Sequence, residues 1–174
     1  MPWETVADIL LARGEGMEVH PIAPVYDERS KVLILGSFPS VKSREAAFFY
    51  GHPQNRFWKV LAAVCGRCEP RSIDEKRELL LSNGIALWDV IASCEIQGSS
   101  DSTIRNVVPN DIAVILNQAD IRAIYVNGKT SEKFYNKYLR PIAGMEAVCL
   151  PSTSPANAAW TLEKLIEAWR VIRS

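Results

Sequence analysis

The stretch KVLILGS, residues 31–37, is a short and nearly continuous apolar run that ends in Gly and Ser. Three further segments share this pattern: GIALWDVI (84–91), IRAIYVNG (121–128) and EAVCLPS (146–152). A strand that is apolar along its whole length is buried on both faces, which is typical of a parallel sheet. The sequence therefore predicts four strands of a mainly parallel sheet.

Amphipathic helical patterns alternate with these strands. NRFWKVLAAVCGR (55–67) ends near Gly66, and SIDEKRELLLSNG (72–84) opens with Ser72 and Glu75 at capping-box spacing. Similar patterns cover residues 109–118, 130–139 and 161–173. This alternation predicts a three-layer α/β/α fold around a central, mainly parallel four-stranded sheet, with residues 1–174 forming a single domain.

Composition and charge exclude several classes of protein. Lys and Arg together number 20, as do Asp and Glu, so the net charge of zero argues against binding polyanions through bulk charge. A local basic stripe on one face remains compatible with that balance. No apolar run approaches the roughly 20 residues of a membrane span, and the N-terminus lacks a basic region before an apolar stretch. We therefore expect a cytoplasmic protein without membrane association.

Cysteine and histidine are too sparse to predict a metal site. Cys65 and Cys68 form a lone close pair, Cys94 and Cys149 are scattered, and the histidines are His20 and His52. A closed zinc or iron–sulfur site would need a second close pair or a cluster of histidines, so we expect free thiols and no metal or cofactor.

Two common enzyme motifs are also missing. The chain has neither G-x-G-x-x-G nor a P-loop, which gives little support to a nucleotide-phosphate site. G-x-S-x-G is absent, and His52 is the one histidine expected near the pocket, which argues against a Ser–His hydrolase.

Polar loops follow all four predicted strands: GSFPS (36–40), WDVIAS (88–93), VNGKT (126–130) and PSTSPAN (151–157). Residues 88–106 are interpreted as a strand end followed by a long polar loop. Ligands of such sheets bind beyond the carboxyl ends of the strands, so the four loops should converge on one site. Each loop alone has a simpler interpretation: Asp89 could cap a helix or form a turn, and Ser154 or Asn157 could start the last helix.

The segment FFYGHPQNRFW (48–58) joins these loops and carries a family resemblance. HPQNRFWKV (52–60), YVNGK (125–129) and LPSTSPANAAWTLEKLIEAWR (150–170) resemble segments of the uracil-DNA glycosylase superfamily, including its mismatch-specific uracil/thymine-DNA glycosylases. LGSFPSVKSREAAFFYGHPQNRFW (35–58), together with STSPAN (152–157), is most similar to the hypoxanthine-DNA glycosylases, also called DNA-deoxyinosine glycosylases. The resemblance extends from about residue 20 to the C-terminus.

The resemblance implies a monofunctional glycosylase that flips a deaminated base out of DNA and hydrolyses its N-glycosidic bond with water. The favoured base is hypoxanthine, with uracil as a secondary substrate. The mismatch-specific branch has an asparagine in a G-[IV]-N-P-G motif, where this chain has Phe38. The hypoxanthine branch is thought to rely on the asparagine of P-x-N-R-F-W, which implies that Asn55 is catalytic and acts on water or the sugar through its carbonyl oxygen.

The remaining site residues follow from the same resemblance and from side-chain chemistry. Tyr50 offers a stacking face, Asp89 accepts hydrogen bonds from ring N–H groups, and Arg56 approaches a phosphate. The expected base-binding residues are Phe38, Tyr50, Asp89 and Asn127. The expected DNA-binding residues are Ser37, Ser40, Arg56, Lys129, Ser152, Ser154, Pro155 and Asn157.

Alternatives remain open at this stage. The aromatics of residues 48–58 could fill the core while Asn55 caps a helix, although a capping role is compatible with catalysis. The chain could be a glycosylase for uracil or mismatched thymine, or a non-catalytic nucleic-acid-binding or nucleotide-binding α/β module. For the glycosylase we expect a monomer that acts on double-stranded DNA containing a deaminated base, with single-stranded DNA as a second substrate.

Overall fold

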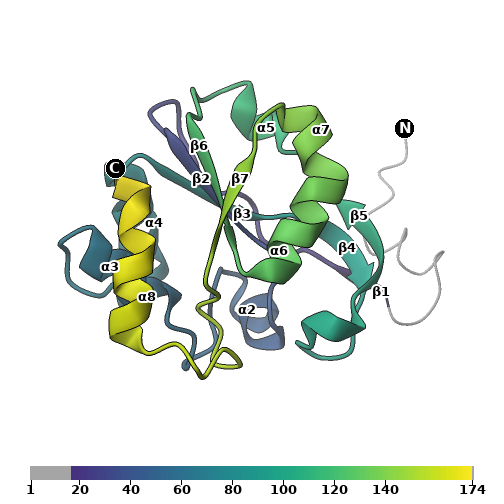
Figure 1. Cartoon of the computed structure of the whole chain (residues 1–174), viewed down its shortest axis with the longest axis horizontal. Helices are drawn as coiled ribbons and strands as arrows, with labels where there is room; N and C mark the ends of the chain where they lie inside the picture. The colour runs from purple at the N-terminus through teal and green to yellow at the C-terminus, as the bar shows by residue number, and fades with distance from the viewer. Residues whose placement is uncertain (1–16, 174) are drawn as a thin grey trace.

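A computed structural model describes residues 17–173 (Figure 1). The predicted apolar segments form a sheet in the order β3-β2-β6-β7, and its three strand pairs are all parallel. Its strands are β2 (Val32–Gly36), β3 (Ile85–Asp89), β6 (Ala123–Asn127) and β7 (Ala147–Leu150). The predicted four-stranded parallel sheet is therefore confirmed.

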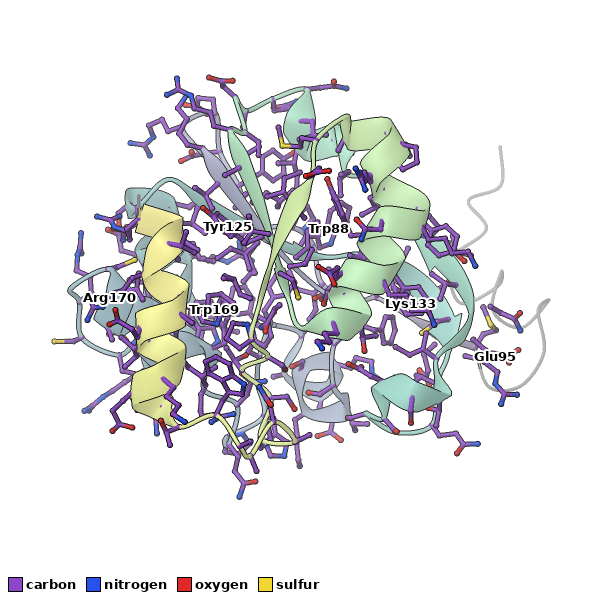
Figure 2. The ribbon with its side chains drawn as sticks, in the orientation of Figure 1. Trp88, Glu95, Tyr125, Lys133, Trp169 and Arg170 are labelled. Atoms are coloured by element: carbon purple, nitrogen blue, oxygen red, sulfur yellow. The ribbon has the colours of Figure 1, made fainter. Side chains whose placement is uncertain are left out.

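Both faces of this sheet are buried, which explains why its strands are apolar at nearly every position. Along β2, Ile34 packs into one hydrophobic cluster, whereas Leu33 and Leu35 pack into the other. Tyr125 of β6 joins Ile34 and Trp169 in the cluster beneath the C-terminal helix (Figure 2). Helices cover the two faces as two separate layers, which confirms the three-layer α/β/α prediction (Figure 1).

The helices divide by the face that they cover. One layer consists of α3 (Phe57–Val64), α4 (Ile73–Ser82) and α8 (Leu162–Trp169), which a 3-10 turn (Arg170–Arg173) extends. The other layer consists of α5 (Ala113–Leu116), α6 (Lys129–Phe134), a π-helix (Tyr135–Leu139) and α7 (Arg140–Ala143). A short helix, α2 (Val41–Ala46), follows the first strand of the sheet.

The helices begin only partly where the sequence predicts. The Ser72 hydroxyl accepts a hydrogen bond from Glu75 N, as predicted, but the Glu75 carboxylate accepts from Arg71 N, so the capping box is not reciprocal. Helix α8 starts after Thr161, whose hydroxyl accepts from Lys164 N, and neither Ser154 nor Asn157 caps it. The helix expected over 109–118 shrinks to α5.

The strand end predicted at Trp88 and Asp89 is confirmed, because β3 ends at Asp89. The long polar loop predicted to follow it was wrong in its extent, because strands of a second sheet take up its two ends and leave only residues 96–104 between those strands. Strands β1 (Met17–Val19), β4 (Ile91–Glu95) and β5 (Arg105–Pro109) pair antiparallel in the order β1-β4-β5, and a 3-10 turn (Asp101–Thr103) lies between the last two. These strands are short and partly polar, and β4 pairs with a segment more than seventy residues earlier in the chain. Their stability depends on that distant pairing rather than on a local pattern.

The passage from β3 into β4 places Asp89 at the carboxyl edge of the parallel sheet. Val90 N and Ile91 N donate to Gly36 O (2.8 Å) and Ser37 O (3.1 Å), so the chain crosses the end of β2. The buried Asn110 side chain donates from Nδ2 to the carbonyl oxygens of Asp89 (2.9 Å) and Ile91 (3.2 Å). The backbone of Asp89 is therefore held from both sides.

The expected single domain of residues 1–174 includes residues 1–16 and Ser174, which lie outside the described residues, as does the expectation about an N-terminal signal. Within residues 17–173, no helix has both the length and the apolar character that crossing a membrane requires.

Candidate active site

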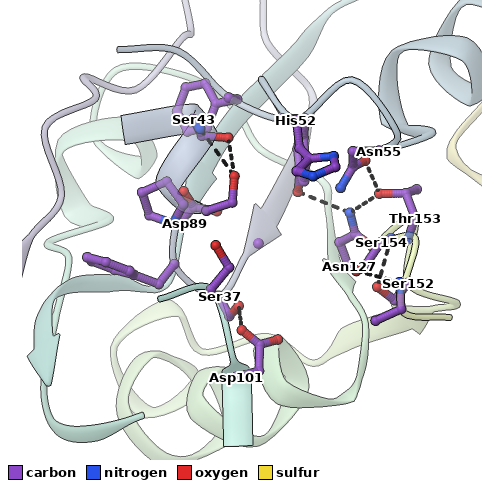
Figure 3. Close-up of a pocket in the computed structure, with 18 of the residues that line it drawn as sticks. Ser37, Ser43, His52, Asn55, Asp89, Asp101, Asn127, Ser152, Thr153 and Ser154 are labelled. Carbon is purple, nitrogen blue, oxygen red and sulfur yellow. Dashed lines mark hydrogen bonds between the residues drawn. The ribbon is translucent and has the colours of Figure 1, made fainter. Parts of the chain in front are cut away.

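A cavity of about 300 Å³ opens where the four strands of the parallel sheet end (Figure 3). Gly36, Asp89 and Asn127 end three of these strands, and the loop after β7 supplies Thr153, so the four loops converge as expected. Ten of the residues assigned from the sequence line the cavity, namely Ser37, Phe38, Ser40, Tyr50, Asn55, Asp89, Asn127, Ser152, Ser154 and Pro155. The exceptions are Arg56, Lys129 and Asn157.

One end of the cavity requires a glycine. A Cβ atom at Gly36 would overlap Asp89 Oδ1 and lie 2.9 Å from Tyr50 Oη. A side chain of any size would therefore collide with two groups that line the cavity. The end of β2 approaches them so closely only because Gly36 has no side chain.

Asp89 lines one side of the cavity, and His20 contacts Asp89 without lining the cavity itself; we call this pair the acceptor wall. His20 Nε2 lies 2.7 Å from Asp89 Oδ2, and the two side chains are only 2% and 5% exposed. Ile22 N donates to His20 Nδ1 (3.1 Å), so Nδ1 must accept and the proton of the neutral ring is assigned to Nε2. His20 therefore donates to Asp89 Oδ2, while Oδ1 faces Gly36 and the cavity.

The sequence did not identify His20 as a site residue, because His52 was the one histidine expected near the pocket. His20 directly follows β1, and its backbone N donates to Ala92 O (2.7 Å) in the antiparallel sheet. Its ring packs edge-on against Phe38 and Trp88 at centroid distances of 6.1 and 6.4 Å. No local sequence signal marks this position, because the pairing of β1 with β4 brings it to the site.

The opposite side, which we call the donor wall, consists of Tyr50, Asn55, Asn127 and Thr153 (Figure 3). Asn55 Oδ1 accepts from Phe57 N and from Thr153 Oγ1, each at 2.9 Å. Asn127 Nδ2 donates to Thr153 Oγ1 (3.0 Å) and to Tyr50 Oη (3.1 Å), and Asn127 Oδ1 accepts from Thr153 N (3.1 Å). Thr153, which the sequence did not identify, is fully buried at the centre of this network.

Tyr50 has an unusual backbone conformation and a neutral side chain. Its φ of +52° lies in the left-handed region, which bulky residues rarely adopt. The ring stacks on Phe57 at a centroid distance of 4.1 Å, so only the opposite ring face is available to a base. Burial, with the nearby Asp89 carboxylate as a second cause, raises the pKa of the Tyr50 phenol, which therefore keeps its proton.

The Arg56 guanidinium has a different role from the predicted phosphate contact. It donates to the carbonyl oxygens of Ser154 (2.9 Å), Asn157 (3.1 Å), Thr153 (3.4 Å) and Trp160. The guanidinium thus holds the loop after β7 in place from within the protein. The sequence could not indicate this, because the carbonyl groups lie about a hundred residues further along the chain.

Several predicted DNA-binding hydroxyls also bond to the protein itself. Ser40 Oγ accepts from Ser43 N (3.1 Å) and caps α2, and Ser37 Oγ donates to Asp101 Oδ1 (3.3 Å). Ser152 Oγ accepts from Ser154 N (3.1 Å). Each nevertheless lines the cavity, together with further residues that the sequence analysis did not assign: Pro39, Ser43, Phe49, His52, Ser99, Asp101 and Ala156.

Lys129 and Asn157 border a neighbouring groove rather than the cavity itself. This groove, of about 630 Å³, shares Ser152, Ser154 and Ala156 with the cavity, so the loop after β7 separates the two spaces. Pro155 and Ala156 are exposed on that loop. Within residues 17–173, no group of three or more His, Cys, Asp or Glu side chains is arranged to hold a metal ion.

Comparison with known proteins identifies the family. The model of the uracil DNA glycosylase superfamily matches residues 23–173. The chain belongs to the uracil-DNA glycosylase superfamily. The resemblance seen in the motifs of residues 35–58, 125–129 and 150–170 is thereby confirmed.

Two relatives of this chain are both described as hypoxanthine DNA glycosylases. A hypoxanthine DNA glycosylase of Methanosarcina barkeri is 34% identical over 143 residues, which cover 81% of this chain and 89% of the relative. A hypoxanthine DNA glycosylase of Methanosarcina acetivorans is 33% identical over 150 residues, which cover 85% of this chain and 93% of the relative.

A solved structure shares the fold. The solution NMR structure of a protein described as a uracil DNA glycosylase from Methanosarcina acetivorans matches with a TM-score of 0.73 and 31% identity. The match covers 88% of this chain and 97% of that one. The superfamily assignment and the three-layer fold therefore agree.

Proposed function

We propose that this chain is a monofunctional DNA glycosylase that removes hypoxanthine from DNA, with uracil as a secondary substrate and without a cofactor. The observation that carries the proposal is a cavity with one acceptor wall and one donor wall, in a chain 33–34% identical to two hypoxanthine DNA glycosylases. Asn55 is the proposed catalytic residue, and Phe38, Tyr50, Asp89 and Asn127 are the proposed base-binding residues.

The target nucleotide must leave the base stack to reach the cavity. Extrusion costs a few kcal/mol, and an aromatic platform returns about 1–3 kcal/mol for each stacked base. The free face of the Tyr50 ring is suited to this role, because Phe57 supports its other face. Water then attacks the anomeric carbon and leaves an abasic site.

Asp89 gives the cavity a preference for deaminated bases. The Oδ1 atom can only accept, and both hypoxanthine, through N1–H, and uracil, through N3–H, offer a donor. Adenine instead has a lone pair at N1, which would face the carboxylate and be repelled by it. Asp89 therefore favours the deaminated base over its parent, adenine.

The loop after β7 is the proposed contact with DNA. Pro155 and Ala156 are exposed and small enough to enter the space that the flipped base leaves. Lys129, in the neighbouring groove, is exposed and suited to a phosphate. With a net charge of zero, the protein should bind DNA with a moderate salt dependence, as a monomer in the cytoplasm, and should prefer duplex over single-stranded substrates.

A panel of labelled duplexes tests this function. The duplexes contain inosine, uracil, a G·T mismatch or no lesion, and each is incubated with the protein and then treated with alkali. Strand breaks at inosine that need alkali, with weaker breaks at uracil, are the expected result. Cleavage at uracil or mismatched thymine without inosine would replace the proposed substrate with that base. Binding without cleavage of any duplex would indicate a non-catalytic module.

A further inference from the structure

Two backbone N–H groups determine the direction of the hydrogen bonds in the donor wall. A backbone N–H can only donate, so each side-chain atom that it meets must be an acceptor. Phe57 N meets one atom of the Asn55 amide, and Thr153 N meets one atom of the Asn127 amide. Both of these amide atoms are therefore oxygens, whichever way the amides would otherwise turn.

The rest of the network follows from these two fixed points. With Asn127 Oδ1 on Thr153 N, Asn127 Nδ2 must donate to Thr153 Oγ1 and to Tyr50 Oη. Thr153 Oγ1 then accepts from Asn127 and gives its own hydrogen to Asn55 Oδ1. The Tyr50 oxygen likewise accepts from Asn127, which leaves the phenol hydrogen available to the cavity.

This direction leaves Asn55 with a donor on the cavity side. Asn55 Oδ1 already accepts two hydrogen bonds, whereas Nδ2 has no hydrogen-bond partner among residues 17–173 and points away from Thr153 (Figure 3). We propose that Asn55 acts as a hydrogen-bond donor to the departing base, and that Thr153 is the positioning residue that holds the amide in this orientation. The inference rests on the proposed glycosylase function and replaces the role expected for the Asn55 carbonyl oxygen.

The chemistry of base departure needs a donor at this point. The C1′–N9 bond breaks and its electron pair stays on the purine, while a C1′–O bond forms with water. The proton that the water loses neutralises the purine anion, so the products are hypoxanthine and an abasic sugar. Negative charge spreads over the purine as the bond breaks, and a preorganised donor such as Asn55 Nδ2–H stabilises it.

Replacing Asn55 by aspartate distinguishes a hydrogen-bond donor role of this side chain from an acceptor role. The carboxylate can still accept from Phe57 N and Thr153 Oγ1, so the fold is retained, but it presents an oxygen in place of Nδ2. We expect Asn55→Asp and Asn55→Ala each to lower single-turnover inosine excision by about 100-fold to 1,000-fold, the usual effect of losing one such donor. Asn117→Asp, at an exposed asparagine directly after α5, is the matched control and should keep the wild-type rate.

Thr153 is tested by a pair of variants. Thr153→Val keeps the shape but removes the hydroxyl, and we expect about a tenfold loss of excision. Thr153→Ser retains the hydroxyl and should recover most of that loss, which a merely structural role for the methyl group would not allow. Thermal melts of all variants check that the fold is retained.

The outcomes separate this inference from the proposed function. If the wild type excises no hypoxanthine, the function itself is wrong. If the wild type is active and Asn55→Asp keeps more than about a tenth of its rate while Asn55→Ala does not, Asn55 acts as an acceptor and the inference is overturned. Equal losses of excision in Thr153→Ser and Thr153→Val would show that the Thr153 hydroxyl does not position Asn55.

Discussion

The acceptor wall and the donor wall face the same cavity but are built differently. The acceptor wall presents one carboxylate oxygen, and its orientation depends on a single chain of bonds from Ile22 N through His20 to Asp89. The donor wall is neutral, and several bonds that begin at Phe57 N and Thr153 N hold it. In both walls a backbone N–H group, rather than a side chain, determines which atoms face the cavity.

This difference predicts different responses to mutation. A buried carboxylate with one side-chain donor is costly to leave unpaired, so the acceptor wall should affect stability and base choice together. The donor wall is connected by more bonds, so single losses there should lower the rate of excision with smaller effects on the fold.

The largest effect is expected where the two walls meet. Gly36→Ala would place a methyl group against both Asp89 Oδ1 and Tyr50 Oη, so we expect at least about a 100-fold loss of inosine excision and a lower melting temperature. Gly144→Ala is the control for excision: at a φ of +68° it should lower the melting temperature through backbone strain, but an added Cβ meets no atom within 4 Å, so the excision rate should stay at the wild-type value. Wild-type excision in Gly36→Ala would show that a base does not occupy this end of the cavity.

Asp89→Asn should replace the hydrogen-bond acceptor that the acceptor wall presents to the cavity with a donor. His20 Nε2–H still requires an acceptor, so the new amide oxygen should turn toward His20 and Nδ2 should face the cavity. We expect about a tenfold or greater loss of inosine excision and a changed inosine-to-uracil ratio, with adenine discriminated less strongly. Excision rates on matched inosine, uracil and adenine duplexes measure this. Unchanged ratios among the three would place Asp89 outside the base contact.

His20→Leu should weaken the acceptor wall mainly through stability. The change leaves Asp89 Oδ2 buried without its donor, which costs about 1–3 kcal/mol of the free energy of unfolding. His20→Gln keeps an N–H group near the same point and should lose less. Denaturant unfolding of both variants, with inosine excision measured in parallel, tests the comparison. Equal destabilisation by leucine and glutamine would mean that the ring fills space without orienting Asp89.

The smallest effect is expected for Tyr50→Phe in the donor wall. The ring and its stacking on Phe57 remain, but Asn127 Nδ2 loses one acceptor and the cavity loses one donor. We expect about a fivefold loss of excision, against a clearly larger loss for Tyr50→Ala, which also removes the stacking platform. Single-turnover rates compare the two variants. Equal losses of excision in the two variants would mean that Tyr50 contributes mainly through its hydroxyl and not through stacking.

Much of the fold could be predicted from the sequence because its information is local. The parallel strands are apolar along their whole length, and their polar ends indicate the loops that form the site. The antiparallel sheet could not be predicted, because β4 and β5 are short and partly polar and β4 pairs with the distant β1. That sheet is what brings His20 to Asp89.

The sequence by itself determined the parallel sheet, the superfamily motifs and most of the residues that line the cavity, because burial pattern and residue type are properties of short segments. Only the tertiary structure decided what those residues present to a substrate. An asparagine can offer an oxygen or an amide group, and the choice at Asn55 depends on Phe57 N and on Thr153, which is 98 residues away. Arg56 likewise contacts carbonyl groups instead of solvent because the loop after β7 folds over it. Hydrogen-bond direction depends on which partner lies within about 3 Å, and the fold alone brings those partners together.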